Sequence, residues 1–172
     1  MKKHSFKDWL IAVRPWSFPA SAMPVIVTLA YLYWAYGVIE WANGLLALVG
    51  IVIFHASGNA WSDYFDFERG VDRVDTFGVK TLTSGQFMPL EIRNLAIGLM
   101  VPAVIIGLWL VMRTGLPLLW IGVCGAMCSL LYPCLKYRAF GDFVIFVAYA
   151  ILPTLGITYI TMGKFLPDVW LI

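Results

Sequence analysis

Acidic side chains are concentrated in one part of the chain. Six of the ten acidic residues fall between positions 63 and 91, directly after a long apolar run; they are Asp63, Asp66, Glu68, Asp72, Asp75 and Glu91. If the apolar run is a helix that continues a turn or two past Trp61, positions 55, 59, 63 and 66 lie about one turn apart on one face. These positions are His55, Asn59, Asp63 and Asp66. The spacing predicts that carboxylate and amide oxygens converge near the end of this helix.

Oxygen ligands of this kind favour a hard cation. Unpaired carboxylates close to hydrocarbon carry a free-energy cost, so we expect a compensating positive charge. Mg²⁺ usually takes one or two protein carboxylates and completes its octahedron with water and phosphate oxygens, which predicts a phosphate-bearing substrate. Basic residues on the same side could bind the phosphate oxygens that the metal leaves free. The candidates are Arg69, Arg73, Lys80, Lys136 and Arg138.

Other interpretations of the same residues remain open at this level. The segment DYFDFERGVDRVD could be a solvated loop whose acids and bases pair with one another. His55, a polar residue inside an apolar run, favours a structural hydrogen bond to a neighbouring helix over metal ligation. A cation transporter or channel subunit could also use Asp63 and Asp66 as ion ligands, although its acids would be expected deeper in the apolar runs. A non-catalytic membrane scaffold is a third class of function.

The composition requires a membrane to position these residues. Of the 172 residues, 61% are hydrophobic and only 13% are charged, which excludes a water-soluble globule. Apolar runs long enough to cross a bilayer predict an all-α, polytopic bundle of about five transmembrane helices in one domain over residues 1–172. The expected crossings are 18–38, 41–61, 94–112, 116–134 and 140–162, with one long polar stretch, the aspartate-rich loop, at about 62–93.

Charge gives the orientation and excludes one class of partner. Ten lysines and arginines fall in the N-terminal segment, the long loop and the connection after the fourth crossing, against Arg113 and Lys164 on the other side. This asymmetry predicts that the N-terminus and the aspartate-rich loop are cytoplasmic, in a protein integral to the cell (inner) membrane. The net charge of +2, without a dense basic run, argues against nucleic-acid binding.

Two strings of residues are recognisable. The string GNAWSDYFDFERGVD at 58–72, followed by KTLTSG at 80–85, resembles the first aspartate-rich motif of the UbiA-type intramembrane prenyltransferases. Within that superfamily it is most similar to the menaquinone branch, the 1,4-dihydroxy-2-naphthoate polyprenyltransferases. Further similar stretches are 9–24, 132–141 and 155–156, so the resemblance covers nearly the whole chain.

The resemblance implies a reaction and assigns residues to it. An isoprenyl diphosphate would bind through Mg²⁺ and lose diphosphate, and the allylic cation would alkylate an aromatic acceptor. The menaquinone branch implies 1,4-dihydroxy-2-naphthoate as the acceptor; 4-hydroxybenzoate or a glycerol phosphate are the alternatives. By position, Asp66, Asp72 and Lys80 correspond to the catalytic set. The metal ligands would be Asn59, Asp63, Asp66 and Asp72, and the diphosphate contacts Arg14, Arg73, Lys80, Lys136 and Arg138.

Two departures from the family pattern bear on these assignments. Family members usually carry Asn directly before the first aspartate, where this chain has Ser62, so either Asn59, one turn earlier, supplies the amide oxygen or this ligand is missing. The family also has about nine helices and a second aspartate-rich motif, whereas this sequence ends at Ile172 after the fifth apolar run. The resemblance therefore leads us to expect a partner C-terminal half, and no activity from these residues alone.

Overall fold

The computed structural model describes residues 4–37, 39–72, 81–136 and 140–171, and these are mostly helical, with no strand among them. Arg73, Lys80 and Arg138 lie outside the described residues. In chain order the elements are α1 (Phe6–Val13), η1 (Pro15–Ser17), α2 (Pro19–Tyr36), α3 (Trp41–Glu68), α4 (Pro89–Thr114), α5 (Leu116–Leu135), α6 (Gly141–Phe146), η3 (Val147–Ile151), α7 (Leu152–Met162) and η4 (Pro167–Leu171).

The predicted all-α membrane bundle is confirmed. Among the described residues, α3, α4, α5 and the combined segment Gly141–Met162 are long and apolar enough to cross a bilayer. The segments Phe6–Ser17 and Pro19–Tyr36, bent by 52° from each other, make a fifth span if they are counted as one. The polar stretch expected at 62–93 is shorter in the structure, because α3 continues to Glu68 and α4 already begins at Pro89.

Proline and glycine mark the helix boundaries. Pro19 and Pro89 occupy first-turn positions of α2 and α4, where a missing N–H removes no intrahelical hydrogen bond. Helix α2 ends at Gly37 (φ 77°) and α7 ends at Gly163 (φ 70°), left-handed conformations that glycine adopts without a steric penalty. These stops create the short connections that pack successive helices against one another.

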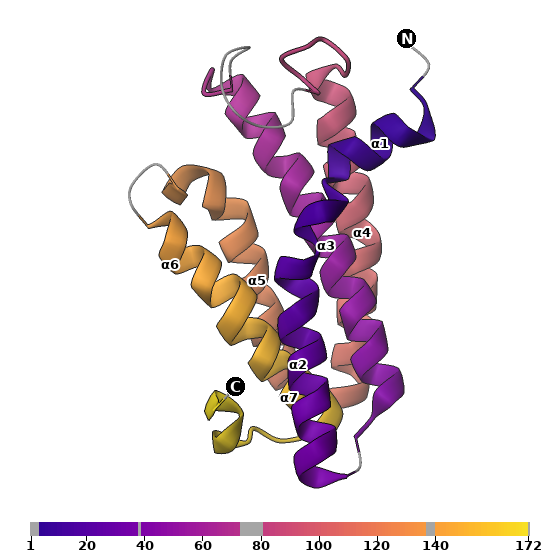
Figure 1. The fold of residues 1–172 in the computed structure, drawn as a ribbon, viewed down its shortest axis with the longest axis vertical. Helices are drawn as coiled ribbons and strands as arrows, with labels where there is room; N and C mark the ends of the chain where they lie inside the picture. The colour runs from indigo at the N-terminus through magenta and orange to yellow at the C-terminus, as the bar shows by residue number, and fades with distance from the viewer. Residues whose placement is uncertain (1–3, 38, 73–80, 137–139, 172) are drawn as a thin grey trace.

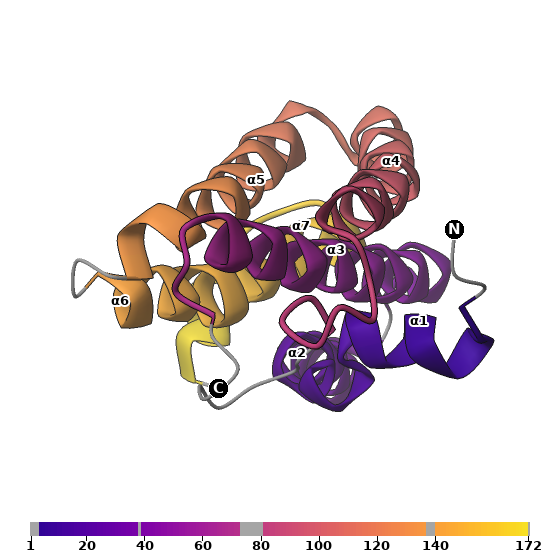
Figure 2. The same cartoon turned by 90° about the horizontal axis from the view of Figure 1, so that it is seen from above.

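Helices α3 and α4 form the longest packed pair, and α3 also contacts α2, α5 and α7 (Figures 1 and 2). The pair approaches closely at Gly50, where a Cβ atom would lie only 2.9 Å from Cγ2 of Ile106. In Figure 1, α1 crosses the upper end of the bundle, near the end of α3 and the start of α4. Helix α1, the C-terminal end of α3 and the start of α4 therefore share one end of the molecule, as the charge distribution predicts.

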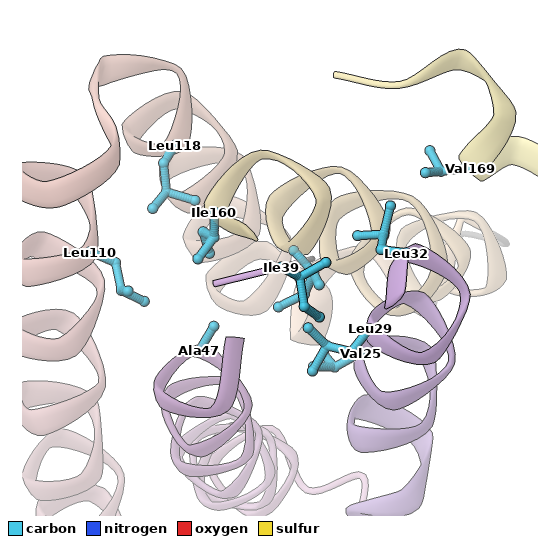
Figure 3. Close-up of a cluster of buried hydrophobic side chains, with 10 residues drawn as sticks. Val25, Leu29, Leu32, Ile39, Ala47, Leu110, Leu118, Ile160 and Val169 are labelled. Atoms are coloured by element: carbon cyan, nitrogen blue, oxygen red, sulfur yellow. The ribbon is translucent and has the colours of Figure 1, made fainter. Parts of the chain in front are cut away.

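Two buried apolar clusters hold the bundle together. The larger one joins α2, α3, α4, α5, α7 and η4 and contains Val25, Leu29, Leu32, Ile39, Ala47, Leu110, Leu118, Ile157, Ile160 and Val169 (Figure 3). The smaller one lies under α1 and the segment before α4 and contains Ala12, Ala60, Leu82, Phe87, Ile92 and Ala96. The larger cluster packs the helices together at the end of the bundle away from α1. The smaller cluster packs α1 beside the C-terminal part of α3.

Large apolar side chains also cover the outer surface. Trp34 is 81% exposed, Met112 78% and Trp120 68%. Apolar patches of this extent are rare on soluble monomers, but they are the surface that lipid tails require. Together with the spans, they identify an integral membrane protein.

Candidate functional site

A cavity of about 610 Å³ runs along the inner face of α3. Its α3 lining extends from Ala47 to Asp66, and these 19 residue steps span about 28 Å at about 1.5 Å of rise per residue. That length is close to the roughly 30 Å thickness of the hydrocarbon core. Polar side chains line the end near Asp66, whereas the rest is lined mainly by apolar residues of α3, α4, α5 and α7.

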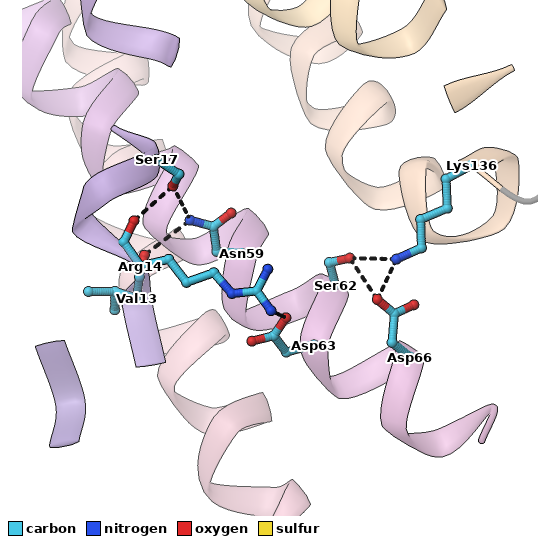
Figure 4. A network of polar contacts seen from close by, with 8 residues as sticks. All are labelled: Val13, Arg14, Ser17, Asn59, Ser62, Asp63, Asp66 and Lys136. Carbon is cyan, nitrogen blue, oxygen red and sulfur yellow. Dashed lines mark hydrogen bonds and ion pairs between the residues drawn. The ribbon is translucent and has the colours of Figure 1, made fainter. Parts of the chain in front are cut away.

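Asp66 and Lys136 form an ion pair at the polar end (Figure 4). Lys136 caps the C-terminus of α5 and also donates a hydrogen bond to Ser62 Oγ at 3.2 Å, one turn before Asp66 on α3. Its ammonium lies 5.6 Å from the ring centre of Tyr132, one turn earlier on α5. The pair therefore joins α3 to α5 across the cavity and puts both signs of charge on its wall.

Asp63 and Arg14 form a second ion pair, which joins α3 to the junction of α1 and η1. The Asp63 side chain is 5% exposed and the Arg14 side chain 27%. Arg14 lines the cavity, whereas Asp63 is not part of its lining. The two acids expected to converge are thus divided: Asp63 faces Arg14, and Asp66 faces Lys136.

Asn59 and His55 continue the polar face of α3 away from Asp66. Asn59 Nδ2 donates to Val13 O at 3.0 Å and to Ser17 Oγ at 2.9 Å. His55 Nδ1 lies 2.9 Å from Ser21 Oγ, and its Nε2 lies 3.3 Å from Ser17 Oγ. The interpretation of His55 as a residue hydrogen-bonded to a neighbouring helix is confirmed.

Asp72 is brought back over the end of α3 by a turn. The backbone N–H groups of Val71 and Asp72 donate to Asp66 O at 2.9 and 3.3 Å. Partial burial raises the pKa of Asp72 above its ordinary value, and the negative charge of Asp66 raises it further. Asp72 and Asp66 therefore lie within electrostatic reach of each other, although only Asp66 lines the cavity.

The donor set fits Mg²⁺ only in part. In the described part of the chain, no three His, Cys, Asp or Glu side chains gather closely enough to surround an ion. Mg²⁺ needs only one or two carboxylates, however, when phosphate and water fill its other positions. Asp66 and Asp72 are two carboxylates of that kind, and the amide oxygen of Asn59, seven residues before Asp66 on α3, points away from Val13 and Ser17 in Figure 4.

Several residues of the site were missed from the sequence. Ser62, considered there only as a departure from the family pattern, accepts a hydrogen bond from Lys136. Tyr132 and Tyr149 line the cavity, and the spacing of four residues between Tyr132 and Lys136 was an available signal. Arg69, a candidate for phosphate binding, instead donates to Pro133 O at 2.8 Å and ties the end of α3 to α5.

The profile of the UbiA prenyltransferase family matches residues 21–172. UbiA prenyltransferase domain-containing protein 1 of Mus musculus is 28% identical over 170 residues, which cover 94% of this chain and 50% of that protein. The Danio rerio protein of the same name is 29% identical over 149 residues, covering 82% and 44%. The Drosophila melanogaster homolog is 36% identical over 69 residues, covering 39% and 19%. The chain spans about half the length of the first two relatives. Since the family profile matches residues 21–172, which are most of the chain, this chain belongs to the UbiA prenyltransferase family.

Proposed function

We propose that this protein transfers a polyprenyl group from an isoprenyl diphosphate to an aromatic acceptor. One observation carries the proposal: a cavity about as long as the hydrocarbon core, charged at one end and apolar along the rest. Such a cavity matches an isoprenyl diphosphate, whose charged head and apolar tail are joined end to end. The relatives are named UbiA prenyltransferase domain-containing protein 1, and this name supports the same reaction class.

The charged end is proposed to hold the diphosphate. Mg²⁺ bound by Asp66 and Asp72, with the Asn59 oxygen as a further ligand, would neutralise the charge that grows on the leaving group. Lys136 and Arg14 would donate charge-assisted hydrogen bonds to the oxygens that the metal leaves free. The family resemblance adds Lys80 to the catalytic set and Arg73, Lys80 and Arg138 to the diphosphate contacts.

The apolar part of the cavity is proposed to hold the prenyl tail. An allylic cation reacts with water, so the same walls must keep water away from the reacting carbon. Tyr132 and Tyr149 lie in the wall, and the π face of an aromatic ring attracts a cation. Both rings are therefore candidates to shield the cation until the acceptor ring attacks.

The acceptor is proposed to be 1,4-dihydroxy-2-naphthoate, as in the menaquinone branch that the motifs at 63–72 and 81–85 resemble. The aspartate-rich end would face the cytoplasm, where a soluble acceptor can reach it. The test compares this acceptor with 4-hydroxybenzoate and glycerol phosphate in membranes that contain the native protein, by mass spectrometry of the prenylated product. A product from either of the other two alone would refute the menaquinone assignment.

The diphosphate site is tested by binding, without turnover. The chain is placed in lipid nanodiscs and titrated with a thiodiphosphate analogue of farnesyl diphosphate, with Mg²⁺ or with EDTA. We expect the analogue to need Mg²⁺, and Asp66→Asn and Asp72→Asn each to weaken it at least about tenfold, as for loss of a charged ligand. Glu40→Gln, an exposed acid at the start of α3, is the matched control. Binding that ignores both EDTA and the two substitutions would overturn the proposal.

A further inference from the structure

Arg14 has an unusual backbone conformation. Its φ and ψ are 56° and 61°, and among the described residues it is the only one other than glycine with a positive φ. A left-handed non-glycine residue costs about 1–3 kcal/mol, and the residue before a proline, here Pro15, ordinarily favours an extended backbone. Contacts from elsewhere must therefore hold Arg14 in this conformation.

One side chain of α3 holds the chain on both sides of Arg14. Asn59 Nδ2 donates to Val13 O, one residue before Arg14, and to Ser17 Oγ, three residues after it. The Ser17 hydroxyl in turn donates to Arg14 O at 2.8 Å (Figure 4). Asn59 thus binds the carbonyl of the residue before Arg14 directly. It reaches the carbonyl of Arg14 itself through the Ser17 hydroxyl.

The reversal at Arg14 determines where its guanidinium lies. The chain turns from α1 into η1 there, and the side chain reaches both Asp63 and the polar end of the cavity. The buried Nε of Arg14 has no hydrogen-bond partner among the described residues. A buried donor without a partner costs about 1–3 kcal/mol. An anionic oxygen bound in the cavity would remove that cost.

We propose that Asn59 is a positioning residue whose amide nitrogen holds Arg14 in the left-handed conformation that presents the guanidinium to the diphosphate. This role belongs to the nitrogen of Asn59, so it is separate from metal ligation by the oxygen. The inference rests on the proposed diphosphate site. It assigns to a residue of the aspartate-rich region an effect on the N-terminal segment 46 positions earlier in the chain.

The first test separates the two atoms of the Asn59 amide. Asn59→Asp keeps an oxygen that can bind a metal but removes both N–H donors. We expect its affinity for Mn²⁺, measured by electron paramagnetic resonance without diphosphate, to equal or exceed that of the native chain. Its affinity for the thiodiphosphate analogue should fall about 10- to 100-fold, the loss of one charge-assisted hydrogen bond. Unchanged analogue binding would overturn the proposal.

A double-mutant cycle removes the effect of the added charge. If Asn59 acts through Arg14, Asn59→Ala combined with Arg14→Gln binds the analogue no more weakly than Arg14→Gln alone. If the losses in affinity of the two single variants multiply in the double variant, Asn59 acts independently of Arg14, which would refute the positioning role. Ser17→Ala, which removes one contact and keeps Asn59, should weaken binding in the same direction. Asn94→Ala, on an exposed position of α4, is the control, with circular dichroism and size-exclusion chromatography checking the fold of each variant.

The outcomes distinguish this inference from the function on which it rests. If the native chain fails to bind the analogue, the proposed function fails. If the native chain binds it and the cycle gives multiplied losses, the proposed function stands and only the role of Asn59 fails.

Discussion

Lys136→Met should destabilise the fold measurably, because it removes a cation that pairs with a nearly buried carboxylate, Asp66. The Asp66 side chain is 9% exposed and that of Lys136 18%. Removal of one partner from a fully buried pair costs about 3–5 kcal/mol, and the partial exposure of Lys136 and the nearby Ser62 hydroxyl reduce this to about 2–3 kcal/mol. Asp66→Asn should cost only about 1 kcal/mol, since the long Lys136 side chain can carry its ammonium toward water.

The decisive variant is the double substitution Asp66→Asn with Lys136→Met. It removes both charges, so its cost should be about 1 kcal/mol and well below that of Lys136→Met alone. The free energy of unfolding is measured for all four proteins by titration with sodium dodecyl sulfate in mixed micelles, followed by tryptophan fluorescence. If the two single costs simply add in the double variant, Asp66 and Lys136 do not interact in the folded chain and the reasoning is wrong.

Three further predictions concern packing, acid stability and the cavity. Gly50→Ala should destabilise the fold by about 1–2 kcal/mol, because its Cβ would lie 2.9 Å from a side chain of α4. Gly98→Ala has open space around its Cβ, so in the same titration it should be neutral or stabilising by up to about 1 kcal/mol. A hydrogen bond from Tyr36 lowers the pKa of Asp168, so the stability contributed by its carboxylate is present above about pH 4 and is lost as the pH falls through the lowered pKa. Melting curves between pH 6 and pH 3 should show this loss in the native chain, and a smaller loss in Asp168→Asn. Gly122→Leu should fill the apolar part of the cavity and weaken binding of a 20-carbon prenyl thiodiphosphate about tenfold. Binding of the 5-carbon analogue should not change. Equal effects on both ligands would mean that the prenyl tail binds elsewhere.

The helices were predictable because their signals are local. Long apolar runs require crossings, and the continuation past Trp61 that the spacing at 55, 59, 63 and 66 assumed is present in α3, which ends at Glu68. The bounds of the polar stretch were less accurate, since acidic residues inside the last turns of α3 and the first turn of α4 have the composition of a loop. Composition does not distinguish a polar helix end from a polar connection.

The candidate site was predictable by residue type but not by pairing. The acids and bases of one end could be listed from the positive-inside asymmetry and the motif, yet the choice of Arg14 for Asp63 and Lys136 for Asp66 depends on which helix ends meet. Nor did the sequence reveal that the Asn59 nitrogen binds the chain around Arg14, because that contact joins residues 46 positions apart.

By itself the sequence determined that this chain lies in a membrane as an α-helical bundle, with its acids gathered at one end. Hydrophobic run length, charge asymmetry and residue type are properties of short segments, so no tertiary contact is needed to recognise them. Tertiary structure alone decided which carboxylate faces which cation and how far the apolar cavity extends. Those features depend on the relative placement of α1, α3 and α5, which packing between distant segments fixes.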